Sequence, residues 1–80
     1  MGERMTYNED CIAHFAFRYA LGRKTAASSI VVKHLTANWD RLFPATRPAI
    51  QREIRTAIDD GSAGRPCDVK EWQKILELKP

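Results

Sequence analysis

The sequence predicts an all-α fold, a compact bundle of four to five short helices. Apolar side chains recur at spacings of three and four along most of the chain, which is the pattern of amphipathic helices. Helix-capping patterns precede these stretches, and glycine or proline follows most of them. The chain has 80 residues, 44% of them hydrophobic, which is enough for one core. We therefore expect a single helical domain over residues 1–80, with residues 1–5 disordered.

The first helix is expected from about residue 7 to residue 21. Thr6 and Glu9 have the spacing of a capping box, and Gly22 is a suitable C-terminal stop. Phe17 lies off the main apolar face, so it either widens the buried stripe or serves as an exposed anchor for a partner. The face that we expect to be buried consists of Ile12, Phe15, Ala16 and Tyr19.

The second helix is expected to begin at Thr25. The β-branched run at residues 30–32 also suits a short buried strand, and the sequence leaves this choice open. Trp39 continues the apolar pattern as a helix end or a separate turn, and Pro44 ends it. The expected apolar face of this helix consists of Ala27, Ile30, Val31, His34 and Leu35.

Two further helices complete the predicted bundle. One runs from Thr46 to Asp60, with Arg47, Arg52 and Arg55 left for solvent. The other begins at Asp68, which we expect to act as its N-cap. The shared core is expected to contain Phe15, Tyr19, Ile30, Leu35, Ile54, Ile58, Trp72 and Ile75.

From the motifs of the sequence we expect neither catalysis nor metal binding. The sequence has no Gly-rich phosphate loop, nucleophile elbow or His-Glu-x-x-His motif, so we expect no enzyme and no cofactor. Cys11, His14, His34 and Cys67 together make the ligand set of a Cys₂His₂ zinc site. The cysteines, however, stand far apart instead of pairing on one turn, so we expect no metal and two buried free thiols.

A binding site for an acidic group is expected at the turn after the first helix. Thirteen Lys and Arg against ten Asp and Glu give a formal net charge of +3, which favours acidic partners. Cations, hydroxyls and free backbone N–H groups at this turn suit a phosphate or a carboxylate. The alternative is that the cations only neutralise the helix C-terminus. The expected partner-binding residues are Arg18, Arg23, Lys24, Thr25, Arg47, Arg52 and Arg65.

No membrane association is expected from the sequence. The longest apolar runs have three or four residues, whereas a membrane span needs about 20. The polar N-terminus lacks the apolar region of a secretory signal, so we expect a cytoplasmic protein.

Two segments carry a resemblance to a known group of proteins. Residues 17–25 (Phe-Arg-Tyr-Ala-Leu-Gly-Arg-Lys-Thr) and 64–68 (Gly-Arg-Pro-Cys-Asp), followed by Trp72, resemble small proteins carried by phages and prophages. The resemblance implies an origin in a mobile element and assigns no activity. By analogy with anti-CRISPR proteins, our hypothesis is a stoichiometric inhibitor of a host defence complex with an acidic patch.

Two alternatives to an inhibitor remain open at the level of sequence. One is a small DNA- or RNA-binding accessory protein, which the positive charge favours although no helix has a basic recognition face. The other is a structural or assembly factor that is ordered as an oligomer. The sequence does not separate these classes, and the oligomeric state stays undetermined.

Overall fold

The computed structural model describes residues 3–23 and 27–80. These ranges contain no strand, so the all-α prediction is confirmed and residues 30–32 are helical. In chain order the elements are α1 (Tyr7–Ala20), α2 (Ala27–Ala37), the 3₁₀ turn η1 (Trp39–Arg41), α3 (Thr46–Asp60) and α4 (Pro66–Leu76).

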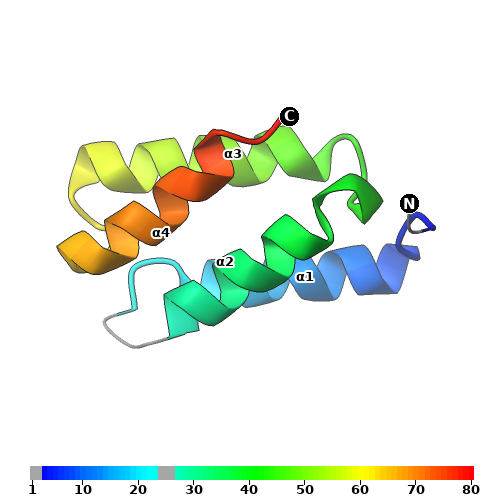
Figure 1. The fold of residues 1–80 in the computed structure, drawn as a ribbon, viewed down its shortest axis with the longest axis horizontal. Coiled ribbons are helices and arrows are strands. Elements are labelled where there is room, and N and C mark those ends of the chain that lie inside the picture. Colours follow the sequence, from blue (N-terminus) through cyan, green and yellow to red (C-terminus); the bar gives the residue numbers. More distant parts are fainter. Residues whose placement is uncertain (1–2, 24–26) are drawn as a thin grey trace.

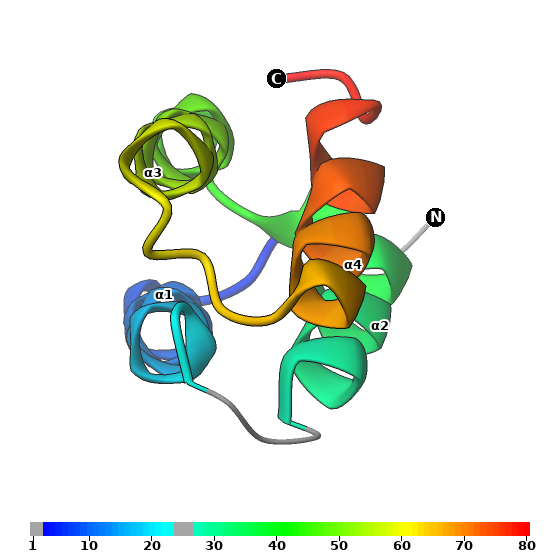
Figure 2. The ribbon, with the colours of Figure 1, turned by 90° about the vertical axis from the view of Figure 1, so that its left-hand side faces the viewer.

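The helices form two antiparallel hairpins, α1–α2 and α3–α4, that stack on each other (Figure 1). Helix α1 packs against α3, and α2 packs against α4 (Figure 2). The helices within each of these stacked pairs run in the same direction. The second helix therefore packs on the fourth, and the core lies between the two hairpins.

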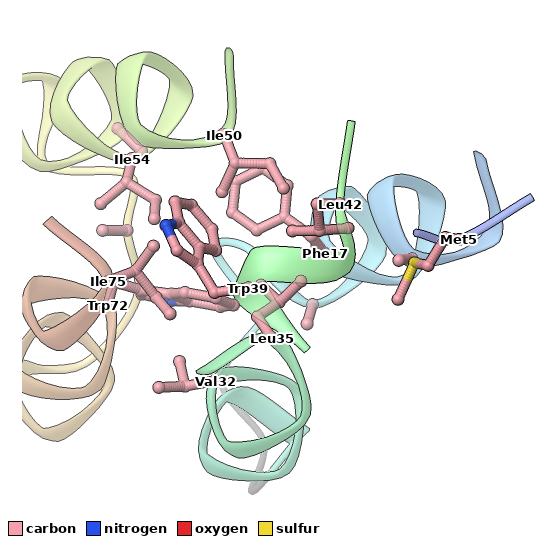
Figure 3. Packing of buried hydrophobic residues seen from close by; sticks show 14 residues of the cluster. Met5, Phe17, Val32, Leu35, Trp39, Leu42, Ile50, Ile54, Trp72 and Ile75 are labelled. Atoms are coloured by element: carbon pink, nitrogen blue, oxygen red, sulfur yellow. The ribbon is translucent and has the colours of Figure 1, made fainter. Parts of the chain in front are cut away.

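Buried side chains from all four helices converge on this core (Figure 3). Leu35, Ile54, Trp72 and Ile75 are buried as predicted, and Ile58 packs at the edge. The other members of the buried cluster are Met5, Ala13, Phe17, Ala20, Val32, Trp39, Leu42, Ile50, Ala57 and Ala63.

The predicted buried face of α1 is wrong. Phe15 and Tyr19 are exposed, and α1 instead buries Asp10, Ala13, Phe17 and Ala20. Asp10 favours this rotation, because its carboxylate accepts hydrogen bonds from Phe43 N–H (2.9 Å) and the Thr46 hydroxyl (2.7 Å) at the start of α3. With Asp10 turned inward, residues three and seven positions later turn inward too, which buries Phe17.

The predicted core position of Ile30 is also wrong, for a similar reason. The Ser28 hydroxyl donates a hydrogen bond of 2.5 Å to the buried carboxylate of Asp68 on α4. This bond sets the rotation of α2, so that Val32 and Leu35 face the core and Ile30 faces solvent.

The helix ends agree with the sequence at α1 and differ at α4. The predicted capping box is confirmed, because Glu9 N–H donates to the Thr6 hydroxyl and Thr6 N–H donates to the Glu9 carboxylate. Helix α4 has Arg65 as its N-cap and Pro66 in its first position, so Asp68 lies in the first turn and is not the N-cap. The predicted start of the second helix, Thr25, lies outside the described residues.

Contacts with distant parts of the chain hold both ends of α1 in place. Met5, in the segment that we expected to be disordered, is buried, and its N–H donates to the carbonyl of Arg41 (2.8 Å). At the other end, Gly22 has a φ of 84°, and a Cβ at this position would lie 2.7 Å from the backbone oxygen of Ser62. The turn after α1 therefore packs closely on the α3–α4 connection.

Candidate protein-binding surface

A row of exposed apolar side chains runs along the side of α1 that faces away from the core. Their exposed fractions are 70% for Tyr7, 68% for Ile12, 71% for Phe15 and 59% for Tyr19, and Cys11 between them is also exposed. Tyr7, Cys11, Phe15 and Tyr19 follow one another at spacings of four, and Ile12 lies three residues before Phe15, so each has a neighbour on the same side of the helix. We call these five residues the outer face of α1.

The grouping of these side chains distinguishes this surface from scattered exposed hydrophobics. Single exposed apolar side chains are common, whereas a contiguous patch marks an interaction site. Two tyrosines, a phenylalanine and an isoleucine at these exposures leave on the order of 400–600 Å² open, which is the upper range for a monomer. Figure 2 shows α1 at the edge of the bundle, with α2 and α3 against its other sides.

Two arginines lie at the C-terminal end of the outer face. The guanidinium of Arg23 is 4.3 Å from the ring centroid of Tyr19, and its Nε donates to the Tyr19 carbonyl (3.0 Å). Arg18 donates from Nε to Glu53 on α3 (3.0 Å), and its side chain is 60% exposed. Arg23 thus neutralises the helix C-terminus and also offers a cation beside an exposed aromatic ring.

The carboxylates nearest to the outer face already have partners. Glu53 accepts from Arg18 and from His14 Nε2 (2.8 Å). Burial raises the pKa of Glu53, but the hydrogen bonds from His14 and Arg18 outweigh it and leave that pKa below its ordinary value. Hydrogen bonds from Thr6 lower the pKa of Glu9. These carboxylates are therefore ionised, and Glu53 balances the charge of Arg18. Among the described residues at the C-terminal end of the outer face, Arg23 is the cation that pairs with no carboxylate.

A shallow hollow adjoins the outer face where α1 meets α2. It encloses about 270 Å³, and most of its lining is apolar. Ile12 belongs both to the hollow and to the outer face, while Ala13 and Ala16 form part of its wall. Because two alanines line it, the hollow has room for a partner side chain.

The remaining predicted site residues are placed elsewhere. Arg47 donates to the Leu42 carbonyl (2.8 Å) at the start of α3, the end of the bundle opposite Arg23 (Figure 1). Arg65 donates to the Asp68 carboxylate (2.9 Å), and this bond raises the pKa of Arg65. Arg52 is exposed on α3. Lys24 and Thr25 lie outside the described residues. Of the predicted set, Arg18 and Arg23 adjoin the outer face.

The residues considered for a zinc site are not brought together. Cys11 and Cys67 are both exposed, which corrects the expectation of buried thiols. His14 is held by Glu53, and His34 is exposed on α2. In the described part of the chain, no group of three or more His, Cys, Asp or Glu side chains could hold a metal ion.

Sequence reasoning assigned Ile12, Phe15 and Tyr19 to the core and did not consider Tyr7. One feature of the sequence could have indicated this exposed row. Helix α1 has a second apolar stripe, formed by Ala13, Phe17 and Ala20, on its other side. Two apolar stripes on one helix need packing partners on both sides. Here the rest of the chain packs against the stripe that contains Phe17 and leaves the stripe that contains Phe15 exposed.

No protein-family model, no curated protein and no solved structure matches this chain. Within residues 3–23 and 27–80, no helix is both long and apolar enough to cross a bilayer. The chemistry and shape of the outer face of α1 are therefore the basis for assigning a function.

Proposed function

We propose that the protein acts by stoichiometric binding of a partner protein, without catalysis, through the outer face of α1. The supporting observation is the contiguous row of Tyr7, Ile12, Phe15 and Tyr19 with arginines at one end. Tyrosine and arginine are the residue types that most often dominate binding energy at protein interfaces, around a dry apolar centre.

The specific form that we propose is an inhibitor of a host defence complex, similar in action to anti-CRISPR proteins, in the host cytoplasm. The resemblance of residues 17–25 and 64–68 to small phage and prophage proteins supports this form. Such an inhibitor works by covering a functional site on its target, which needs a binding surface and no catalytic group. Arg18 and Arg23 would meet an acidic patch on that target.

A second candidate function is the binding of single-stranded nucleic acid. Exposed rings beside an arginine, as at Tyr19 and Arg23, suit the stacking of bases. Single-strand binders, however, align cations along the strand to follow its backbone. Among the described residues, Arg18 and Arg23 lie at one end of the outer face and Arg41 lines the hollow beside it, so the cations do not follow the face as a continuous row, which favours the protein-binding function.

Affinity capture from host lysate, with and without nuclease, tests this function. Wild type is compared with the double variant Phe15→Ser/Tyr19→Ser and with Ile30→Ser, a matched control because Ile30 is 69% exposed on α2. We expect nuclease-resistant recovery of one protein complex by wild type and Ile30→Ser, and its loss with the double variant. The proposal is contradicted if the double variant recovers the complex as well as wild type does, or if nuclease treatment abolishes the recovery.

A further inference from the structure

We infer that the partner presents an acidic amphipathic helix, which lies along the outer face of α1 with its carboxylates at Arg18 and Arg23. This inference rests on the proposed function and adds the chemistry of the partner. It follows from the shape of the surface and from its charge.

The shape favours a helix over an extended segment. From Tyr7 to Tyr19 the outer face is about 18 Å long at 1.5 Å per residue, which matches roughly three turns of a partner helix. An added strand gains its affinity from backbone hydrogen bonds, and the side of a helix offers none. A helix satisfies its own backbone and needs only a ridge and a groove to pack against. Phe15 provides the ridge, and the hollow beside Ile12 provides the groove.

The charge favours acidic flanks on that helix. Arg23 is exposed, and its guanidinium contacts Tyr19 without an ion pair to any described carboxylate. Arg18 is 60% exposed although it pairs with Glu53. The nearby carboxylates of Glu9 and Glu53 accept hydrogen bonds within the chain. A partner carboxylate near Tyr19 would therefore meet the charge of Arg23, which no described carboxylate compensates, whereas a partner lysine would be repelled.

Charge also disfavours a second copy of this chain as the occupant. Each copy has a formal net charge of +3, so two copies repel each other. An antiparallel pair would also place Arg23 opposite the N-terminal end of the other α1. There Glu9 is engaged in the capping box and Asp10 is buried against α3.

The experiment uses two synthetic helical peptides and one oligonucleotide as probes. Both peptides have about 15 residues, the length at which helices become stable, and carry the same leucine and phenylalanine stripe. One has glutamates on the flanks and the other has lysines in their place. The third probe is oligothymidine. Binding to ¹⁵N-labelled protein is followed by chemical-shift changes as salt is raised.

We expect the glutamate peptide to bind at least about tenfold more tightly than the lysine peptide, with a preference that shrinks as salt screens the charges. Arg23→Glu should reverse this preference. Lys33→Glu is the matched control, because Lys33 is exposed on α2 and its reversal changes the net charge equally. Phe15→Ser/Tyr19→Ser should remove binding of both peptides.

Four outcomes overturn the inference: equal binding of the two peptides, binding of neither, tighter binding of oligothymidine, or a solution dimer that Phe15→Ser/Tyr19→Ser converts to monomers. The lysate capture tests the proposed function independently of these results. If capture of a protein complex still depends on Phe15 and Tyr19, the proposed function stands and only the acidic helix is wrong.

Discussion

The rings of Phe17 and Trp72 meet edge to face, with their centroids 5.5 Å apart and their planes at 84°. Both side chains are fully buried, and each comes from a different hairpin. Edge-to-face pairs add roughly 0.5–1.5 kcal/mol to the free energy gained from burial. This contact ties the two hairpins together at the centre of the core (Figure 3).

Trp72→Ala is expected to lower the free energy of unfolding by roughly 3 to 5 kcal/mol, because it empties the centre of the core. Trp72→Phe should cost clearly less, since much of the volume remains. No described residue accepts a hydrogen bond from the indole N–H, so no such bond is lost. Urea titrations of both variants measure the difference. Equal midpoints for wild type and Trp72→Ala would show that the assigned packing of α4 is wrong.

Phe17→Ala and Phe15→Ala make the same chemical change on opposite sides of α1. We expect Phe17→Ala to cost roughly 3 to 5 kcal/mol and Phe15→Ala to stay within about 0.5 kcal/mol. Thermal melts of the two variants under identical conditions test this. The reverse ranking would restore the face of α1 that the sequence pattern predicted.

Gly22→Ala and Gly61→Ala separate close packing from backbone strain. Both glycines have positive φ, 84° and 72°, so an alanine is strained at either position by about 1 kcal/mol. Only at Gly22 would the new Cβ meet another atom, the backbone oxygen of Ser62 at 2.7 Å. We therefore expect the larger loss of stability for Gly22→Ala, measured by chemical denaturation. Equal losses would mean that the turn after α1 does not pack on Ser62.

Stability is expected to fall in acid because of Asp68. Hydrogen bonds from Arg65 and Ser28 hold the pKa of this carboxyl well below its ordinary value. The folded state therefore binds the proton less readily than the unfolded state, whose carboxyl titrates near pH 4. The stability from this group is complete above that pH and is lost as the pH falls below it.

Asp68→Asn tests this assignment. The variant should melt at a lower temperature at pH 7 and should lose less of its stability than wild type between pH 5 and pH 2. Ser28→Ala removes one donor to the same carboxylate and should cost about 1 to 2 kcal/mol at neutral pH. Parallel pH profiles for wild type and Asp68→Asn would mean that other carboxyls control the acid response.

The sequence predicted the helices well because their signals are local. The capping box at Thr6 and Glu9 and the end of the third helix at Asp60 depend on neighbours within one turn, and the structure confirms both. The face that each helix buries could not be predicted from such local signals. It depends on the hydrogen bonds of Asp10 to Thr46 and of Ser28 to Asp68, which join residues far apart in the chain.

The same limit explains the candidate site. Charge pointed to Arg18 and Arg23 as partner-binding residues. The structure shows both exposed, because arginines beside a helix end stay in solvent, and their role in binding stays a prediction. The aromatic row beside them was assigned to the core, since spacing alone does not distinguish two apolar stripes on one helix. In the structure Asp10 faces inward, and this rotation of α1 places Phe17 in the core and Phe15 in solvent.

The stacking of the two hairpins also bears on how the chain could be reconnected. Helices α1 and α3 end, and α2 and α4 begin, at one end of the bundle, whereas α2 connects to α3 at the other (Figure 1). A circular permutant with a linker between the two ends of the sequence, opened at the exposed Pro44–Ala45 bond, would exchange the hairpins in sequence order. Every helix would keep its neighbours, but the cut separates Phe43 from Thr46, which both bond to Asp10, so the permutant would show whether the rotation of α1 needs that connection intact.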